Sequence, residues 1–415
     1  MAEITLFDGL APMPLQRPAT VAELGELVRQ AADGGSVVYP VGGRTQLHLG
    51  RSPDASARKG LALETTALDQ VIDYPARDMT ITVQAGITIS RLQQLLAPEK
   101  QGLPIDVPCA DRATLGGILA TNTCGSRRLG YGSLRDYLLG FTAVNDEGRE
   151  FKAGGRVVKN VAGYDLCKLM IGSLGTLGII TQATLKLKPL PEEQAGVILG
   201  CDSGQLEKLL ECLHASRTRP VCLDILNRAG GRLLFEKAGL EAPPSDWTVL
   251  IGVEGITEAV HWQVQQLVRE LVELGPGATI QARVGCTNHP LCRALVDFPA
   301  LEEARLSIRA NLLPSGLPEF CRGVTGPGPE SPMLQAHAGN GIVIGHFLMD
   351  VTKERAEAIV SSWRELARKF QGSAVVTRCP ISWRTRPFVW GPPRGDAWLM
   401  RAVKEKFDPR GVFPG

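Results

Sequence analysis

The sequence has few aromatic residues, no excess of charge of one sign and no long apolar run. Aromatic side chains make up 5% of its 415 residues, and 45 Lys and Arg stand against 43 Asp and Glu. This balance excludes the broad basic footprint of a nucleic-acid-binding protein. No apolar run approaches the roughly 20 residues that span a bilayer. Residues 1–14 lack the basic and apolar regions of a signal peptide. We therefore expect a cytoplasmic protein, or one that meets a membrane through a partner.

Cysteine pairs with redox or metal spacing are also missing. The ten cysteines form no C-x-x-C motif and no iron–sulfur or zinc pattern, and the nearest pair is Cys286 and Cys292. Buried thiols in a reducing compartment are the expected state. If the protein performs redox chemistry, a cofactor rather than its own cysteines must carry the electrons.

Glycine is abundant instead, and three glycine-rich loops lie early in the chain, at 40–46, 114–125 and 172–180. Glycine allows positive φ and close approach of other groups, so each loop could be a tight turn that packs against protein alone. Together they fit a large phosphate-bearing cofactor wrapped by backbone N–H groups. A helix predicted to begin after Thr114 would add an anion site at its N-terminus. The Rossmann and P-loop fingerprints are absent, so another dinucleotide fold is needed.

The length of the chain predicts two or three domains. After Pro191 the dense glycine motifs stop, and predicted strands (196–200, 247–253, 341–349 and 374–377) alternate with predicted helices (203–215, 256–274 and 352–370). This order predicts an antiparallel or mixed sheet with helices on one face. Residues 314–332 are rich in glycine and proline and are predicted to be a surface loop. From Arg378 onward the chain is basic and aromatic.

The order and spacing of these motifs resemble the flavoproteins of the vanillyl-alcohol-oxidase and para-cresol-methylhydroxylase (PCMH) type. Residues 38–45 resemble the pyrophosphate loop of that family. Residues 111–125, 130–132 and 172–181 resemble its second FAD-binding segment, and 407–413 its C-terminal ending. The fold class implied is α+β: a two-subdomain PCMH-type FAD-binding domain followed by an α+β cap domain with a mixed or antiparallel sheet. The implied domains are 1–191 (divided near 60–68), 192–377, and a segment 378–415 that returns to the FAD domain.

The cofactor implied by this resemblance is FAD. It is expected to be non-covalent, because Arg44 stands where tethered members carry histidine. The residues implied to contact FAD lie in the three loops and beside them: Val41, Gly42, Gly43, Arg44, Thr45, Gln46, Pro108, Thr114, Leu115, Gly116, Gly117, Thr121, Asn122, Gly125, Gly132, Gly175, Gly178 and Ile179.

The catalytic half departs from relatives that carry a His-x-Gly-Asp-Gly-Asn-x-His metal motif. The corresponding run, HAGNGIVI, keeps His337 but has Asn340 and Ile344 in place of the acid and the second histidine. Too few ligands remain, so we expect no metal. His346 would share a strand face with Ile344 and is the one conceivable substitute.

The relatives also carry Glu-His-Gly near the C-terminus, where this chain has no acid or histidine to take a proton. The catalytic candidates are therefore His337, together with Arg384 and Arg386, which could bind a carboxylate. The alternative is that this Arg/Trp cluster packs on the flavin or on a partner subunit.

Residues 155–166, GRVVKNVAGYDL, resemble the FAD-binding E subunit of bacterial glycolate oxidase. The resemblance implies a complex that oxidises glycolate, a small 2-hydroxy acid, to glyoxylate. Its partners would be a second FAD-binding subunit and an iron–sulfur subunit, and any contact with the inner membrane would be made through that complex. Two alternatives stay open: a self-sufficient FAD-dependent 2-hydroxy-acid dehydrogenase of D-lactate type, and a non-catalytic FAD-containing scaffold.

Overall fold

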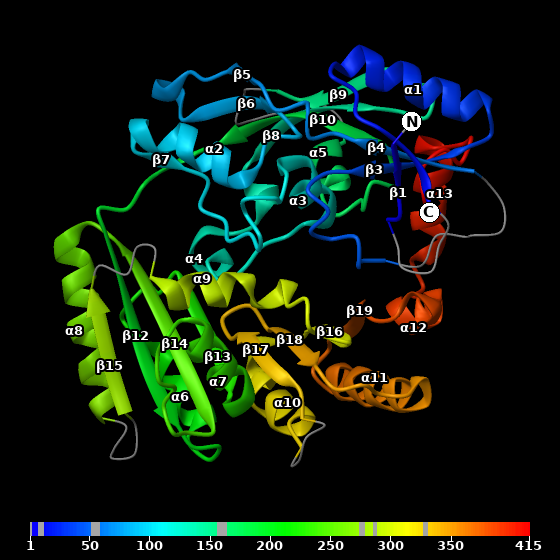
Figure 1. Ribbon diagram of the computed structural model, residues 1–415. Helices are drawn as coiled ribbons and strands as arrows, with labels where there is room; N and C mark the ends of the chain where they lie inside the picture. The colour runs from blue at the N-terminus through cyan, green and yellow to red at the C-terminus, as the bar shows by residue number, and fades with distance from the viewer. Residues whose placement is uncertain are drawn as a thin grey trace. The chain divides into compact units, whose positions relative to one another are not determined.

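The computed structural model describes residues 2–6, 12–50, 59–155, 164–273, 279–284, 289–326 and 331–415. The chain divides into two compact units (Figure 1). The first unit comprises Met1–Cys124, Ser133–Leu190 and Pro392–Gly415, and the second comprises Gly125–Gly132 and Pro191–Gly391. The chain therefore leaves the first unit twice, once briefly and once at length, before its C-terminal segment returns.

A small sheet opens the first unit, with strand order β1-β2-β4-β3. Its strands are β1 (Ala2–Ile4), β2 (Met13–Gln16), β3 (Val37–Val41) and β4 (Gly60–Glu64). Helix α1 (Val21–Asp33) buries one apolar face. Thr20 Oγ1 accepts a hydrogen bond from Glu23 N, while Glu23 Oε2 accepts one from Ala19 N, so side chains satisfy two backbone donors at this end.

A second, antiparallel sheet completes the first unit, in the order β5-β6-β10-β8-β9. Its strands are β5 (Val71–Asp73), β6 (Thr80–Gln84), β8 (Leu138–Val144), β9 (Glu150–Gly154) and β10 (Ile179–Lys186). Helices α2 (Ile89–Leu96), α3 (Leu115–Thr121), α5 (Leu166–Met170) and α13 (Ala397–Phe407) and the short pair β7 (Gln101–Gly102) and β11 (Lys188–Pro189) also belong to this unit. These two sheets fit the predicted two-subdomain fold.

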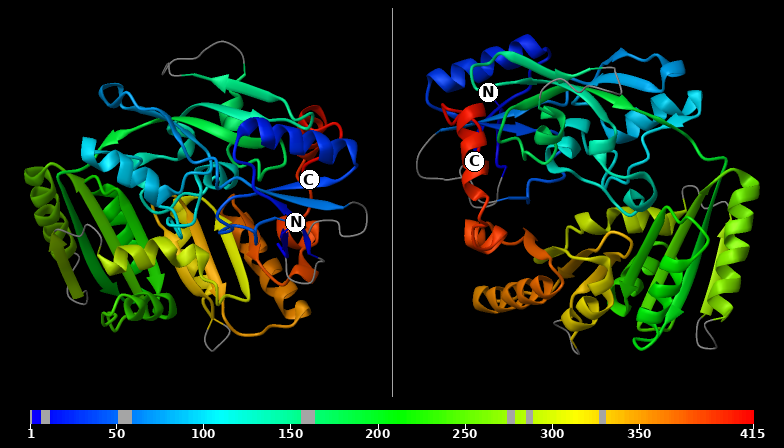
Figure 2. Two further views of the ribbon diagram at one scale, coloured as in Figure 1. Left: turned by 45° about the horizontal axis from the view of Figure 1, so that its top comes forward. Right: turned by 180° about the vertical axis from the view of Figure 1, so that it is seen from behind.

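The second unit is built on one large sheet (Figure 2). Its eight strands lie in the order β15-β12-β14-β13-β17-β18-β16-β19. Its strands are β12 (Glu193–Cys201), β13 (Cys222–Asn227), β14 (Trp247–Gly255), β15 (Thr279–Val284), β16 (Leu306–Asn311), β17 (Met333–His337), β18 (Ile342–Phe347) and β19 (Ser373–Arg378). Every neighbouring pair is antiparallel, which confirms the predicted sheet type.

Helices cover both faces of this sheet, so the prediction of helices on one face is wrong. The larger core contains Leu223 and Ile225 of β13 with residues of α6 (Leu206–Ala215), α8 (Thr257–Glu273), α10 (Leu317–Val324) and α11 (Lys353–Lys369). On the other face, Leu226 of β13 packs with residues of α7 (Arg228–Lys237) and α9 (Pro290–Asp297). The strands are apolar on both faces, and both faces therefore need a cover.

The predicted surface loop 314–332 is also wrong over its first part. A 3-10 turn (Pro314–Gly316) leads into α10, whose Phe320 is fully buried. Proline is tolerated in the first turn of a helix, because a backbone N–H at that position would have no partner within the helix. Pro318 lies in the first turn of α10 and therefore does not indicate a loop. Residues 327–330 lie outside the described part of the chain.

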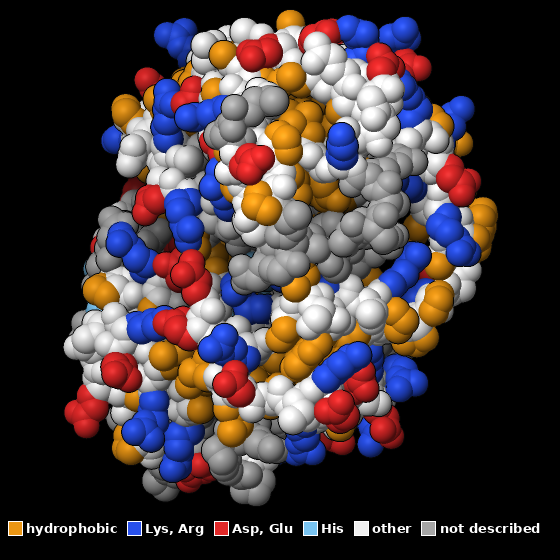
Figure 3. Space-filling view, turned by 45° about the vertical axis from the view of Figure 1, so that its right-hand side comes forward, with side chains coloured by type: hydrophobic (Ala, Val, Ile, Leu, Met, Phe, Trp, Pro, Cys, Tyr) orange, Lys and Arg blue, Asp and Glu red, His pale blue; other side chains and the backbone are white. Residues whose placement is uncertain are grey.

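The basic and aromatic C-terminal segment is shared between the units. A 3-10 turn (Ile381–Trp383) and α12 (Arg386–Trp390) belong to the second unit, and α13 belongs to the first. The predicted functional domains 1–191, 192–377 and 378–415 stay predictions. Basic and acidic side chains are interspersed over the face in Figure 3, in keeping with the balanced composition. Among the described residues, no helix has the length and apolarity to cross a bilayer.

Candidate functional site

The first glycine-rich loop leaves the end of β3 and packs against the residues before α3. A Cβ on Gly42 would lie 2.2 Å from Thr114 Oγ1, and one on Gly43 would lie 1.6 Å from the carbonyl oxygen of Arg112. Neither distance is compatible with a side chain. The two glycines are therefore required by contact between two segments of this chain, whatever else the loop binds.

The backbone N–H groups of this loop are its available donors. From Gly42 to Gln46 none of them donates to a protein acceptor within the described residues. The Arg44 guanidinium is already engaged, because its Nη2 lies 2.5 Å from Glu64 Oε2. A phosphate at this loop would thus be held by main-chain N–H groups, which form anion-binding concavities in such turns.

The second loop was predicted to provide an anion site at the N-terminus of a helix, but its backbone donors are already used within the protein. Thr114 caps α3, and its Oγ1 accepts a hydrogen bond from Gly117 N at 3.3 Å. Leu115 N donates to Ile87 O at 2.9 Å, and Gly116 N donates to Ala85 O at 2.7 Å. The carbonyl groups of residues 85–87, which follow β6, therefore accept from the donors that an anion would need, and this part of the prediction is wrong.

The two glycines in the first turn of α3 differ in the space around them. A Cβ on Gly116 would lie 3.1 Å from Ala85 Cβ, whereas one on Gly117 would meet Thr114 Oγ1 alone within 4 Å. Gly116 is thus a packing position against the sheet. Gly117 is the position in this helix where a bound molecule can approach the backbone.

The third loop meets the C-terminal end of α3. Gly172 N donates to Leu119 O at 2.9 Å and Leu174 N to Ala120 O at 2.8 Å. Two buried polar atoms at this junction, Asn122 Oδ1 and Ser173 Oγ, have no partner within the described residues. Buried polar atoms are nearly always hydrogen-bonded, so two such atoms without partners fit a site for a polar ligand.

The remaining predicted contacts are placed as follows. Gly175, at φ +72°, lies with its Cβ position 3.5 Å from Pro40 Cγ, so the third loop also meets the first. Thr121 Oγ1 donates to Gly117 O, Val41 and Pro108 are buried, and Gly178 precedes Ile179 at the start of β10. Gly125 and Gly132 belong to the second unit. The subgroup motif residues 156–163 lie outside the described part of the chain.

His337 lies in a buried polar cluster of the second unit. Its Nδ1 is 2.7 Å from Asp224 Oδ1, and Asp224 Oδ2 accepts from Ser126 Oγ at 2.5 Å and from Gln335 Nε2 at 2.9 Å. Among the described residues, no acceptor or donor contacts His337 Nε2. Sequence reasoning missed Asp224 and Ser126, because the register that sets Asp224 opposite His337 has no local signal.

His346 is a structural histidine, which contradicts its suggested role as a substitute ligand. Its Nδ1 lies 2.7 Å from Ser307 Oγ and its Nε2 lies 2.9 Å from Phe298 O. Both ring nitrogens are therefore used. No group of three or more His, Cys, Asp or Glu residues in the described part of the chain is placed to hold a metal ion.

The neutrality of His346 predicts a loss of stability in acid. Burial lowers the pKa of His346 from 6.5 to about 4. Between these values the unfolded chain binds a proton that the folded chain does not, so stability is complete above pH 6.5 and falls as the pH drops toward 4. The shift corresponds to about 3 kcal/mol. Urea unfolding at pH 7 and pH 5 should show about 2 kcal/mol of this loss in the wild type and a smaller loss in His346→Gln. An equal loss in both would contradict the assignment.

The two candidate arginines differ in exposure. Arg386 is exposed at the start of α12, and Arg384 is half-buried beside Cys379. Burial raises the pKa of the Cys379 thiol to about 11 despite the opposing effect of Arg384. Trp383 packs edge-on against Phe388, with 6.1 Å between ring centroids. This part of the Arg/Trp cluster thus packs on the second unit itself.

A family model described as "FAD binding domain" matches residues 14–154. The chain is 27% identical to glycolate oxidase subunit GlcD of Bacillus subtilis over 96% of its own length and 87% of that protein. It is 34% identical to subunit GlcE of Escherichia coli over 40% of its length and 46% of that protein.

Two further matches bear on chemistry and fold. The chain is 37% identical to D-2-hydroxyglutarate dehydrogenase of Xanthomonas citri over half of its own length and 43% of that protein. A structure of alkyldihydroxyacetonephosphate synthase covers 97% of this chain, over 77% of its own length, with a TM-score of 0.71 and 18% identity. That likeness confirms the predicted fold class.

The predicted cofactor and reaction class are confirmed by the same findings. The matched domain binds FAD, and the curated relatives are glycolate oxidase subunits and 2-hydroxy-acid dehydrogenases, which act on CH–OH groups. The donors of loop 42–46 and the unpaired atoms of Asn122 and Ser173 fit a phosphate-bearing, polar cofactor of this kind. The chain is an FAD-dependent oxidoreductase that carries an FAD-binding domain over residues 14–154.

Proposed function

We propose that the chain is an FAD-binding subunit of a complex that oxidises glycolate to glyoxylate. The observation that carries this proposal is its similarity to two proteins named as subunits of glycolate oxidase, one of them over nearly the whole chain. Glycolate is a small 2-hydroxy acid, the substrate class of the other curated relatives. The partners proposed are a second FAD-binding subunit and an iron–sulfur subunit that receives the electrons.

In this proposal the first unit holds the cofactor through its three loops. FAD, when bound, supplies the acceptor for the two electrons that leave the alcohol carbon. Main-chain N–H groups from Gly42 to Gln46 meet the pyrophosphate, and Gly117 lets the cofactor approach α3. Asn122 Oδ1 and Ser173 Oγ hydrogen-bond its polar groups. Gly175, Gly178 and Ile179 contribute main-chain contacts. We further propose non-covalent binding, and a cytoplasmic location with membrane contact through the complex.

The test is spectroscopic and compares the chain alone with the co-expressed complex. Glycolate is added anaerobically to each preparation, and the loss of the visible absorbance of the oxidised flavin is followed together with glyoxylate formation. Rapid reduction in the complex supports the proposal. A complex whose flavin stays oxidised with glycolate, or a chain that assembles with no flavin or iron–sulfur protein, contradicts it.

The second candidate is a self-sufficient 2-hydroxy-acid dehydrogenase, and the Asp224–His337 pair favours it. With Nδ1 held by Asp224, Nε2 is the nitrogen of His337 that could accept the hydroxyl proton. Arg384 or Arg386 would bind the substrate carboxylate. Rapid reduction of the isolated chain by glycolate or D-lactate would select this candidate. A folded, colourless chain that takes up no added FAD would instead point to a scaffold.

A further inference from the structure

Lys404, near the end of α13, joins the C-terminal tail to the third glycine-rich loop. Its Nζ donates to Asp408 Oδ2 at 2.5 Å, to Thr176 O at 2.8 Å and to Phe413 O at 3.0 Å. These acceptors use all three protons of the ammonium group. One of them is a backbone carbonyl in the middle of the turn 172–178, and the other two belong to the tail.

Asp408 fixes the tail onto this lysine. Its side chain is 0% exposed, and it accepts hydrogen bonds from Val412 N at 2.7 Å and Phe413 N at 2.9 Å. A buried carboxylate requires a paired charge, and Lys404 provides it. Removing Lys404 would leave the Asp408 carboxylate buried without its paired charge, and removing Asp408 would leave the half-buried Lys404 without its paired charge and the tail without its acceptor.

The same tail also contacts the strand that leads into the first loop. Val412 O accepts from Val38 N at 2.8 Å, and Val412 and Phe413 are buried in a core cluster with Val38 and Ile179. Ile179 directly follows the third loop. The tail is therefore bonded to the base of one predicted FAD loop and to the turn of another.

An aromatic contact continues this connection. Phe407, the last residue of α13, lies 6.2 Å from Phe151 between ring centroids. The Phe151 ring in turn lies 3.5 Å from the Cβ position of Gly178. The tail therefore contacts the turn 172–178 directly at Thr176, and through the Phe151 ring it is linked to Gly178.

We propose that Lys404 and Asp408 are positioning residues for FAD. In this arrangement the contacts of Lys404, Asp408, Val412 and Phe413 form a C-terminal clamp that fixes the turn 172–178 in its binding conformation. The inference rests on the proposed FAD contacts of that turn. The clamp residues follow the second unit in the sequence, so the proposed site also depends on residues of Pro392–Gly415. Because coupling between sites is reciprocal, FAD binding must also tighten the clamp.

The test is FAD binding to the full-length apoprotein. Lys404→Met keeps the length of the side chain and removes its charge. Lys406→Met is the matched control, since Lys406 is exposed on the same helix. Flavin fluorescence titration should give a Kd about tenfold or more above wild type for Lys404→Met, which corresponds to losing one charge-assisted hydrogen bond. Lys406→Met should match the wild type.

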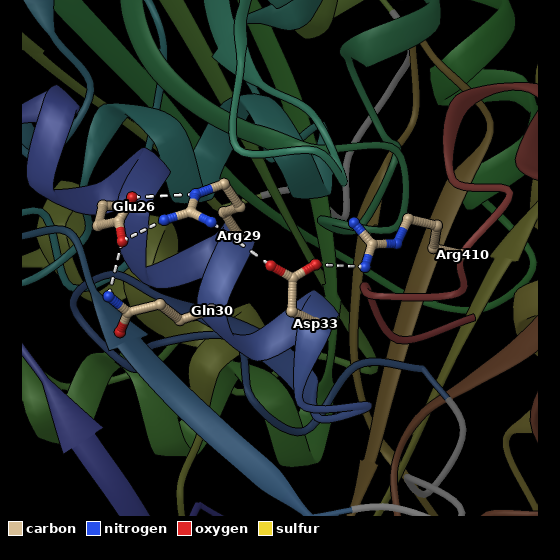
Figure 4. Close-up of polar contacts among 5 residues, drawn as sticks. All are labelled: Glu26, Arg29, Gln30, Asp33 and Arg410. Atoms are coloured by element: carbon tan, nitrogen blue, oxygen red, sulfur yellow. Dashed lines mark hydrogen bonds and ion pairs between the residues drawn. The ribbon is translucent and has the colours of Figure 1, made fainter.

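A second control separates the clamp from the remainder of the tail. Arg410 pairs with Asp33 at the end of α1, in an exposed network with Glu26, Arg29 and Gln30 (Figure 4). Surface pairs of this kind contribute little. Arg410→Gln should therefore leave the FAD Kd within about twofold of wild type.

A second measurement uses the wild-type chain and does not depend on a variant that folds. Saturating FAD should slow hydrogen exchange at the amides of Val412 and Phe413. The proposal is overturned if a folded Lys404→Met binds FAD as tightly as Lys406→Met, or if FAD leaves exchange at these two amides unchanged. Neither measurement uses glycolate, so a flavin that glycolate does not reduce would overturn the proposed function and leave the clamp intact.

Discussion

Gly43→Ala is expected to give a chain that binds no FAD and whose first unit is destabilised by more than about 3 kcal/mol. The new Cβ would lie 1.6 Å from Arg112 O and 2.4 Å from Arg112 C. Overpacking that side chains can relieve costs about 1–3 kcal/mol. Here the obstructing atoms are backbone, so the two loops must separate. The free donors of residues 42–46 would then lose their arrangement.

Gly117→Ala is the matched comparison for this prediction. Its Cβ would meet Thr114 Oγ1 at 3.1 Å and nothing else within 4 Å. Alanine also favours a helix over glycine by up to about 1 kcal/mol. We expect this variant to fold as the wild type does and to bind FAD more weakly, because the methyl group occupies the space for cofactor approach.

The two variants are measured by FAD titration and by circular dichroism, with tryptophan fluorescence as a separate signal. Five of the six tryptophans (247, 262, 363, 383 and 390) lie in the second unit and Trp398 lies in the first. Fluorescence therefore reports whether the second unit still folds. A Gly43→Ala chain with wild-type stability and FAD affinity would mean that the two loops do not pack as described.

The parts of the fold with local signals could be predicted from the sequence. The helix after Thr114, the strands at 247–253 and 374–377 and the three glycine-rich loops each occupy one short stretch, and each forms where expected. The physical reason for the glycines could not be predicted. Gly42, Gly43 and Gly116 face other segments of the same chain, so a pattern that suggests ligand approach arises here largely from packing.

Residues 125–132, which leave the first unit and belong to the second, show why other parts of the fold could not be predicted. Gly125 and Gly132 were expected beside FAD, yet the segment between them belongs to the second unit. Gly130 N donates to Val221 O, and a Cβ on Gly130 would lie 2.8 Å from Val221 Cα. Tyr131 donates to Glu254 at 2.6 Å. These contacts join residues about a hundred positions apart, and nothing in the local sequence indicates which strand will receive the segment.

Asp224→Ala is expected to have the second large effect, a loss of stability of the second unit. Asp224 is 1% exposed and accepts from His337, Ser126 and Gln335, which lie 98 to 113 positions away in the chain. Alanine would leave three buried donors to find other acceptors. Gln335 keeps one at Leu295 O, while Ser126 Oγ and His337 Nδ1, 3.4 Å apart, keep only each other. Removing one member of such a buried cluster costs about 3–5 kcal/mol.

The design compares two substitutions at this position with one elsewhere. Asp224→Asn retains one acceptor oxygen, and the Ser126 hydroxyl can rotate to accept from the new amide, so its loss should be intermediate. Asp202→Ala, at an exposed aspartate of the same unit, should be near neutral. Urea unfolding followed by tryptophan fluorescence should therefore rank wild type and Asp202→Ala first, Asp224→Asn next and Asp224→Ala last.

The outcome also decides which contact holds residues 125–132 to the sheet of the second unit. Ser126 reaches the sheet through Asp224, so Asp224→Ala should speed hydrogen exchange at residues 125–132 along with lowering the unfolding midpoint. Ser126→Ala should reproduce the faster exchange with a smaller loss of stability, because it removes one donor and leaves the carboxylate with two. If Asp224→Ala unfolds at the midpoint of Asp202→Ala, the carboxylate is not the common acceptor. His337 would then lack the partner that fixes its Nδ1, and the second candidate function would lose its structural support.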